Sequence, residues 1–225
     1  ERPLIAASRV PVCAPCLAGI EGWAEAIRCA LCQREVLHEA GLDEQRACGV
    51  CRRKPQTLDR VWAYGPYAGN LRHVIHLLKY DGMRPLARLL GERCASQTDL
   101  GQQADLIVPT PLHWTKRLER GFNQSLLLAQ VVARRHAVPC APSALSRKRA
   151  TPPQAGLSGV QRRASLRGAF TAKRELVEGK RILLVDDVVT TGATLESCAK
   201  ALRRAGAVSV TAMTAARAQL ARRAL

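Results

Sequence analysis

Residues 181–195 read Arg181-Ile182-Leu183-Leu184-Val185-Asp186-Asp187-Val188-Val189-Thr190-Thr191-Gly192-Ala193-Thr194-Leu195. The apolar run 182–185 is short and unbroken, which predicts a parallel strand buried on both faces. Apolar residues then recur every three to four positions from Ala193 to Ala205, and Gly206 follows, so this part predicts a helix. The strand–loop–helix order indicates an α/β fold. It places Asp186 and Asp187 at the carboxyl end of a strand, where open α/β sheets bind ligands.

The loop after the two carboxylates is rich in hydroxyl groups and small residues. At the start of a helix such a loop offers backbone N–H groups to a phosphate. The carboxylates at one end of the predicted site suit hydroxyl groups or a metal ion, and the loop at the other end suits a phosphate. A ribose 5-phosphate would match both ends. In the competing interpretation the acids cap the helix or bind magnesium, but that role would not need the sequence Thr-Thr-Gly-Ala-Thr.

This segment resembles the signature of the type I phosphoribosyltransferases, which bind phosphoribosyl pyrophosphate (PRPP). The resemblance implies that Asp186 and Asp187 are the catalytic pair and engage the 2- and 3-hydroxyls of the ribose. It also implies magnesium, which would neutralise the pyrophosphate. The residues expected to contact PRPP are Val185, Asp186, Asp187, Val188, Thr190, Thr191, Gly192, Ala193 and Thr194, together with Lys79, Thr110 and Arg120.

Length and composition suit one domain of ordinary size with a small appendage, because the chain has 225 residues and 47% hydrophobic content. Further strands are expected over 61–67 and 105–111, and further helices over 70–80 and 123–136. No apolar run approaches membrane-spanning length, so we expect no membrane insertion and a cytoplasmic location. The chain begins at Glu1 without a signal-peptide pattern, and we expect its natural beginning to be missing.

The charge is strongly positive, at +17 with a pI near 10.3. From Arg120 to Arg174 there are eleven Lys or Arg residues and no Asp or Glu. Such a field attracts polyanions, either a pyrophosphate or a nucleic acid backbone, so single-stranded DNA is an expected partner of this basic segment. The competing interpretation is an arginine-rich, solvated surface without a specific partner.

Six of the nine cysteines form three Cys-x-x-Cys pairs. Fifteen residues separate Cys32 from Cys48, which is typical of a four-cysteine zinc ribbon with a structural metal. Disulfides compete, although nothing marks the chain as secreted. The simplest assignment gives one zinc to Cys29, Cys32, Cys48 and Cys51. Cys13 and Cys16 would then be half of a second site, completed by a pair upstream of Glu1, and cross-pairing with a later pair stays open.

Over nearly its whole length the chain resembles the ComF/GntX family, which is associated with DNA uptake during bacterial competence. The resemblance rests on the cysteine pairs, the PRPP loop and the segments 76–82, 108–112, 119–124, 151–154 and 167–170. It implies an N-terminal zinc ribbon over 1–56, a phosphoribosyltransferase-like domain over 57–225, and a lid over 151–157.

Two kinds of function follow from this resemblance. One is magnesium-dependent transfer of ribose 5-phosphate to an unknown acceptor. The other is a protein without catalysis that binds or senses PRPP while handling single-stranded DNA, with competence DNA-uptake proteins as partners.

Overall fold

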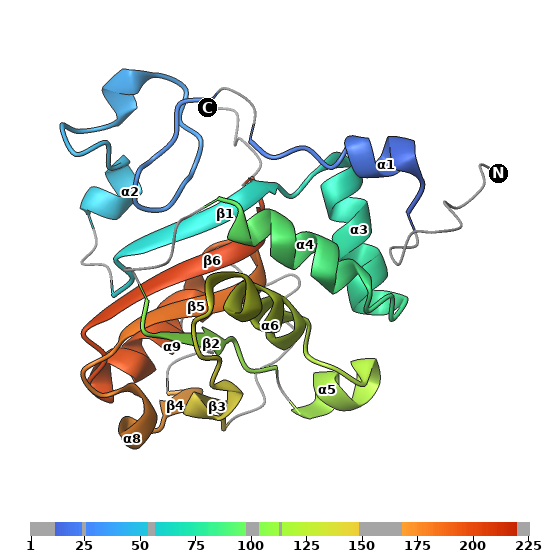
Figure 1. The fold of residues 1–225 in the computed structure, drawn as a ribbon. Helices are drawn as coiled ribbons and strands as arrows, with labels where there is room; N and C mark the ends of the chain where they lie inside the picture. The colour runs from blue at the N-terminus through green and yellow to red at the C-terminus, as the bar shows by residue number, and fades with distance from the viewer. Residues whose placement is uncertain are drawn as a thin grey trace.

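The computed structural model describes residues 12–23, 26–53, 57–97, 104–112, 114–148 and 168–219, apart from the side chain of Arg117. The expected lid and part of the basic segment, Arg149, Arg162, Arg163 and Arg167 included, lie outside these residues. Within them no helix is long and apolar enough to cross a membrane. The elements that follow are shown in Figure 1.

The centre of the molecule is a four-stranded sheet in which every pair of neighbours is parallel. The order is β1-β6-β5-β2, with bounds Arg60–Pro66 for β1, Ser209–Arg217 for β6, Arg181–Val189 for β5 and Leu106–Pro109 for β2. Parallel neighbours need crossover connections, and helices supply them here. The sequence prediction of an α/β fold with a helix-flanked parallel sheet is therefore confirmed.

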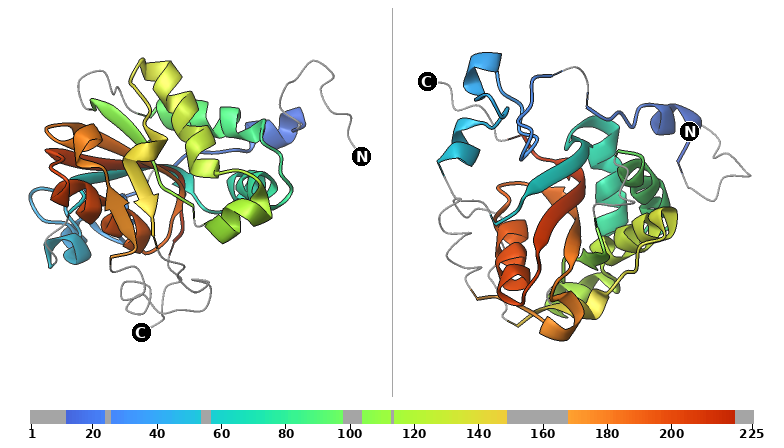
Figure 2. Two further views of the ribbon diagram at one scale, coloured as in Figure 1. Left: turned by 90° about the horizontal axis from the view of Figure 1, so that it is seen from below. Right: turned by 60° about the vertical axis from the view of Figure 1, so that its left-hand side comes forward.

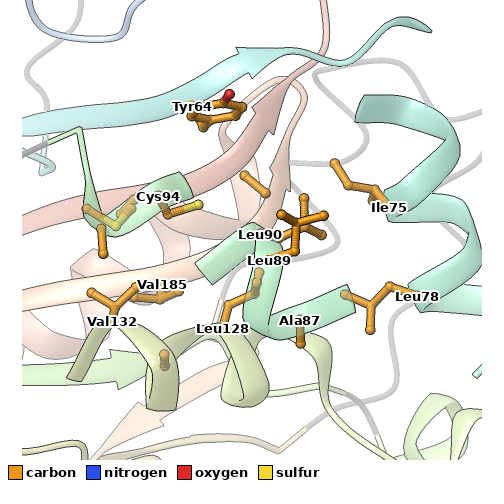
Figure 3. Packing of buried hydrophobic residues seen from close by; sticks show 14 of the residues in the cluster. Tyr64, Ile75, Leu78, Ala87, Leu89, Leu90, Cys94, Leu128, Val132 and Val185 are labelled. Carbon is orange, nitrogen blue, oxygen red and sulfur yellow. The ribbon is translucent and has the colours of Figure 1, made fainter. Parts of the chain in front are cut away.

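Helices cover both faces of this sheet. One face carries α3 (Gly69–Tyr80), α4 (Leu86–Ala95) and α6 (Gln124–His136), and the other carries α9 (Ala193–Arg204). The right-hand view of Figure 2 shows the sheet between the red helix α9 and the green helices. In Figure 3 side chains of α3, α4 and α6 meet over Val185 of β5. Both faces of β5 are thus buried, which explains its continuous apolar sequence.

Short elements complete the fold. A two-stranded antiparallel ribbon joins β3 (Leu145–Arg147) to β4 (Phe170–Ala172). The remaining elements are α1 (Ala14–Ala18), η1 (Glu39–Gly41), α2 (Gly49–Arg52), α5 (Trp114–Arg120), η2 (Pro142–Ala144) and α8 (Arg174–Val177).

The N-terminal cysteine-rich segment packs along β1, the strand at one edge of the sheet (Figure 1). Val61 N donates to Leu31 O at 2.7 Å, and Ala63 N donates to the side-chain Oε1 of Gln33 at 2.9 Å. The indole Nε1 of Trp23 donates to Ala63 O at 2.7 Å. Gln33 has a φ of 55°. This region is uncommon for a residue other than glycine, so the contact with β1 helps to hold Gln33 there.

The strand that carries the acids is longer than predicted. We expected Ile182–Val185, whereas β5 continues to Val189, so Asp186 and Asp187 lie within the strand. The reason is that β6 keeps pairing with β5 as far as Val189↔Arg217, whereas β2 stops at Pro109↔Val185. The acids therefore lie beyond the end of one neighbouring strand and beside the other. The predicted division into domains at 56/57 stays a prediction, and 54–56 lie outside the described part of the chain.

Candidate functional site

Alternation along β5 separates the two carboxylates. Leu183 and Val185 pack under α3, α4 and α6, whereas Ile182 and Leu184 pack with α9. Successive side chains of a strand point to opposite faces, so Asp187 continues the first row and Asp186 the second. Asp186 nevertheless reaches Ser125 of α6, because the pairing of β2 with β5 ends at Pro109↔Val185, one residue before it.

Asp187 is held by a lysine from the end of α3. Lys79 Nζ lies 3.1 Å from Asp187 Oδ1, and the two side chains are only 14% and 13% exposed. Burial lowers the pKa of Lys79, but attraction to Asp187 and then Asp186 outweighs it, so the pKa is raised overall. Lys79 therefore stays charged, and the structure places it beside the acidic pair. Its expected contact with PRPP stays a prediction.

Asp186 lies in a polar network at the start of α6. Its Oδ1 accepts a hydrogen bond from Ser125 Oγ at 2.8 Å and another from Asp187 N at 2.9 Å. Burial, followed by repulsion from Asp187, raises the pKa of Asp186 to about 7, although these hydrogen bonds and Lys79 act in the opposite direction. A carboxyl group whose pKa is raised in this way, because burial disfavours its ionised form, is typical of a functional site.

The loop between β5 and α9 presents a helix N-terminus. Gly192, the N-cap residue, has a φ of 83° and offers no side chain to cap the helix. Thr191 Oγ1 accepts only a long hydrogen bond, 3.4 Å, from Ala193 N. The acidic residue in the first turn of α9, Glu196, accepts a hydrogen bond from Thr57 N at 3.1 Å through its Oε1. The first turn of α9 can thus direct backbone N–H groups at an anion. The contact of 190–194 with a phosphate stays a prediction.

The region around Thr110 and the start of α6 contains buried polar atoms that have no hydrogen-bond partner among the described residues. They are Oγ1 of Thr110, after β2, Nε of Arg120, at the end of α5, and both amide atoms of Gln124, at the start of α6. Thr110 is 6% exposed and Gln124 is 1% exposed. Leaving such groups buried and unpaired costs about 1–3 kcal/mol each. The hydroxyl of Thr110, Nε of Arg120 and Nε2 of Gln124 are donors, and donors without partners fit an anionic ligand. The predicted contacts of Thr110 and Arg120 with PRPP stay predictions.

Neighbouring side chains brace this region. Asn123 Nδ2 donates to Thr110 O at 3.1 Å, and Asn123 Oδ1 accepts from Ser125 N at 3.0 Å. Thr110 N donates to Val185 O at 2.8 Å. Asn123 therefore links the loop after β2 to α6 and, through Ser125, to Asp186. Sequence reasoning missed the hydrogen bonds of Asn123 and Ser125 and the burial of Gln124. The signal was three consecutive polar residues at a predicted helix start.

Basic and aromatic side chains gather near α5. The guanidinium of Arg120 lies 5.0 Å from the ring centroid of Tyr80, and that of Arg84 lies 5.0 Å from that of Phe122. Burial, Arg120 and Arg147 lower the pKa of Lys116. Trp114 is 63% exposed. We call Tyr80, Trp114, Lys116 and Arg120 the α5 surface; it combines positive charge with exposed rings.

The acidic pair fits a hard divalent cation such as magnesium. Carboxylate oxygens are its preferred protein ligands, and it is usually held by one or two of them together with substrate phosphates. Among the described residues, the hydrogen bonds and the ion pair of Asp186 and Asp187 use Oδ1 of each carboxylate. The Oδ2 atoms are the ones that a ligand or its cation would meet.

A second candidate site is a group of four buried cysteines, Cys29, Cys32, Cys48 and Cys51, whose sulfur atoms all lie within 4.8 Å of one another. Cys29 Sγ is 3.7 Å from Cys51 Sγ, and Cys32 Sγ is 3.9 Å from Cys48 Sγ. Four thiolates around zinc at about 2.3 Å are separated by about 3.8 Å in a tetrahedron. The donor set thus fits the predicted structural zinc.

Cys13 and Cys16 lie outside this group, beside and within α1. Their assignment to a second metal site stays a prediction. The lone cysteines behave as packed thiols: Cys94 and Cys198 are buried, and Cys140 is half-buried.

Comparisons with known proteins show what the chain is similar to. Residues 123–224 match the family described as phosphoribosyl transferase domain. The chain is 33% identical to competence protein F of Haemophilus influenzae, covering 84% of each chain. It is 37% identical to the DNA utilization protein YhgH of Escherichia coli K12, covering 72% of this chain and 74% of that one.

Two Bacillus subtilis proteins match a smaller part of the chain. Competence protein ComFC is 36% identical over 48% of this chain and 43% of its own. A solved glutamine PRPP amidotransferase, complexed with ADP and GMP, is 25% identical over 56% of this chain and 25% of its own, with a TM-score of 0.40.

Proposed function

The chain belongs to the family of competence protein F and the DNA utilization protein YhgH, and from this premise we propose that it binds PRPP with magnesium and transfers ribose 5-phosphate to an acceptor. The observation that carries the proposal is the arrangement at the carboxyl edge of the sheet. The acidic pair, of which Asp186 is costly to ionise, lies near a helix N-terminus and near buried polar groups that have no partner among the described residues.

Each part of PRPP has a counterpart in this arrangement. The first turn of α9 and the hydroxyls of 190–194 suit the 5-phosphate. Asp186 and Asp187 suit the ribose hydroxyls. Thr110, Arg120 and Gln124 suit the pyrophosphate, because the Thr110 hydroxyl, Arg120 Nε and Gln124 Nε2 would each gain the acceptor that they lack.

The chemistry requires stabilisation of departing charge. As the bond from the anomeric carbon to pyrophosphate breaks, negative charge grows on the leaving group and positive charge grows on the ribose. Magnesium, when bound, would neutralise the pyrophosphate. Lys79 and Arg120 would add fixed positive charge near it, and the rigid contacts of Asn123 and Ser125 would keep the acids in place.

Calorimetric titration of the zinc-loaded chain with PRPP and magnesium tests the binding. We expect saturable binding by the wild type and a loss of at least about tenfold in affinity for Asp187→Asn, because a charged contact is removed. Asp105→Asn is the matched control, since Asp105 lies at the amino end of β2 and pairs with Arg181. Absence of PRPP binding by the wild type would refute the proposal.

A second candidate function, PRPP-dependent handling of single-stranded DNA, is favoured by the α5 surface. Bases stack on exposed rings and phosphates pair with basic side chains, which is the usual design of sites for single strands. The exposed fractions of Trp114, 63%, and Tyr80, 59%, suit this role. Competence DNA-uptake proteins are the partners that this function would involve.

Fluorescence anisotropy with a labelled oligonucleotide separates the two functions. DNA binding that weakens with salt and changes on addition of PRPP supports the second. Release of pyrophosphate from PRPP in the presence of an acceptor supports the first. The same oligonucleotide should be included among the acceptors that are tried.

A further inference from the structure

Gln124, the first residue of α6, is a polar side chain at a core position. It is only 1% exposed, and neither Nε2 nor Oε1 has a hydrogen-bond partner in the described part of the chain. Leu128 and Val132 follow at intervals of four, so the three residues share one face of the helix. Leu128 and Val132 are fully buried and lie over Val185 of β5 in Figure 3. A buried amide without partners is unfavourable for the fold alone, which indicates a role in binding.

The position of Gln124 in the chain brings its amide to the candidate site. Helical side chains point back toward the N-terminus of their helix, so that of Gln124 is directed past the start of α6. The residues on either side of it already reach the site. Asn123 Nδ2 donates to Thr110 O at 3.1 Å, and Ser125 Oγ donates to Asp186 Oδ1 at 2.8 Å. The amide of Gln124 therefore lies at the carboxyl edge of the sheet, close to Thr110 and Asp186.

The unpaired amide of Gln124 needs more than an anion to satisfy it. Nε2 can donate to a phosphate oxygen, but Oε1 can only accept, and a fully ionised phosphate has no proton to donate to it. A buried acceptor that stays unpaired when the ligand binds would weaken binding. A ligand that satisfies the whole amide therefore brings a phosphate oxygen and an O–H or N–H donor together.

The donor for Oε1 has to enter with the pyrophosphate end of PRPP. In the proposed function the two ribose hydroxyls face Asp186 and Asp187, and each hydroxyl has a single proton to donate. The pyrophosphate end brings O–H groups of its own. One kind is the hydroxyl of a protonated phosphate, and the other is water that enters with magnesium, which usually keeps several waters in protein sites. Both are O–H donors next to phosphate oxygens.

We propose that Gln124 is a specificity-determining residue that selects the pyrophosphate end of PRPP through both atoms of its amide. Nε2 donates to a phosphate oxygen, and Oε1 accepts from the O–H group that accompanies it. This inference rests on the proposed function, because it requires PRPP to bind beside Asp186 and Asp187. The ligand-free protein keeps the amide unpaired at a cost in stability, and binding of the ligand removes this cost.

Calorimetric titration of zinc-loaded Gln124→Met with PRPP and magnesium tests the contact. Methionine keeps the length of the side chain and removes both polar atoms. We expect the affinity for PRPP to fall about 10–100-fold, because two hydrogen bonds to a charged ligand are lost. The affinity for ribose 5-phosphate, which lacks the pyrophosphate, should stay unchanged. Gln130→Met is the matched control, since Gln130 lies on the same helix and is exposed.

The melting temperature without ligand gives a second, independent measurement. Gln124→Met should melt about 2–8 °C above the wild type, because it removes two buried polar atoms that have no partner, whereas Gln130→Met should not. A lower melting temperature together with unchanged PRPP affinity would overturn the inference, since the amide would then support only the fold. Gln124→Leu, which also lacks polar atoms, takes the place of Gln124→Met if circular dichroism shows that the methionine variant does not fold.

The source of the O–H group follows from the ratio of the wild-type affinity for PRPP to that of Gln124→Met, measured with and without magnesium at pH 6 and pH 8. A ratio that is larger with magnesium assigns the donor to water that enters with the cation. A ratio that is larger at pH 6 without magnesium assigns it to a phosphate hydroxyl, because phosphate groups take up a proton at about pH 6. An equal ratio under all four conditions would overturn the role of Oε1.

The outcomes separate this inference from the proposed function. If the wild type does not bind PRPP under any of these conditions, the proposed function is refuted. If the wild type binds PRPP and Gln124→Met binds it equally well, the selection by Gln124 is refuted and the proposed function stands.

Discussion

Replacing Asp186 with asparagine should make the ligand-free protein more stable at alkaline pH while removing PRPP binding. The isosteric amide can still accept the hydrogen bonds from Ser125 Oγ and Asp187 N that the carboxylate accepts. It carries no charge, so the cost of ionising a carboxyl group in this environment disappears. Few single substitutions near a candidate site are expected to stabilise the fold, which makes the prediction discriminating.

The size of the effect follows from the pKa. The pKa of Asp186 rises from 3.8 to about 7 in the folded chain, so the native state binds a proton more tightly than the unfolded state. Its contribution to stability is therefore full below pH 3.8 and is lost as the pH rises towards 7. One pKa unit corresponds to about 1.4 kcal/mol, and roughly three units give an upper limit of about 4 kcal/mol. Asp186 keeps some contact with solvent, so we expect about 2–3 kcal/mol.

Urea unfolding at pH 5, 6, 7 and 8, on zinc-loaded protein without magnesium or PRPP, measures this difference. The free energy of unfolding of Asp186→Asn should gain on that of the wild type at each step from pH 5 to pH 7. Asp105→Asn is the control, because Arg181 lowers the pKa of Asp105 to about 2. That variant should be less stable than the wild type by a constant amount over the same range.

The reasoning fails if the difference between Asp186→Asn and the wild type does not change with pH. It also fails if the substitution destabilises the protein at pH 8. Retained PRPP affinity in a stabilised Asp186→Asn would leave the electrostatic argument intact and refute the role of this carboxylate in binding the ribose.

Further predictions concern the lysine, the cysteine group and the loop. Lys79→Met leaves Asp187 buried without its cation, so the free energy of urea unfolding at pH 7.5 should fall by about 3 kcal/mol, and adding Asp187→Asn should recover most of the loss. Cys32→Ser should lose bound zinc by mass spectrometry and lower the melting temperature by about 10 °C, whereas Cys140→Ser should keep its zinc. Gly192→Ala has room for a Cβ atom but a φ of 83°, so it should cost about 1 kcal/mol of stability and weaken PRPP binding in calorimetry. Gly179→Ala, with a φ of 70° and equal room, should cost the same stability without affecting PRPP.

The sequence predicted the main elements well where burial alone sets the pattern. The expected helix 70–80 is α3, Gly69–Tyr80, and the expected helix 123–136 is α6, Gln124–His136. Helix α4 was not predicted, although Leu86, Leu90 and Cys94 follow helical spacing and are buried. The end of β5 could not be predicted, because it depends on how far β6 continues beside it.

The site was predictable where one segment holds the chemistry and was not where distant segments meet. The acidic pair and the loop 190–194 lie in a single stretch, and Lys79 ends a predicted helix. The hydrogen bond of Ser125 with Asp186 spans 61 positions, and that of Thr57 N with Glu196 Oε1, at the start of α9, spans 139. Such contacts follow from the order of strands in the sheet, which local periodicity does not contain.

The packing of the cysteine-rich segment along β1 has a consequence for self-association. A strand at the edge of a sheet offers unpaired N–H and C=O groups to any other strand that meets it, and natural proteins cover such edges to prevent aggregation. Here Leu31 O and Gln33 Oε1 take the N–H groups of Val61 and Ala63, and Trp23 takes the carbonyl of Ala63. Removing zinc would loosen this cover and expose β1, so chelation should produce intermolecular strand pairing that grows with protein concentration. Bound zinc would then prevent the sheets of two molecules from pairing at their β1 edges.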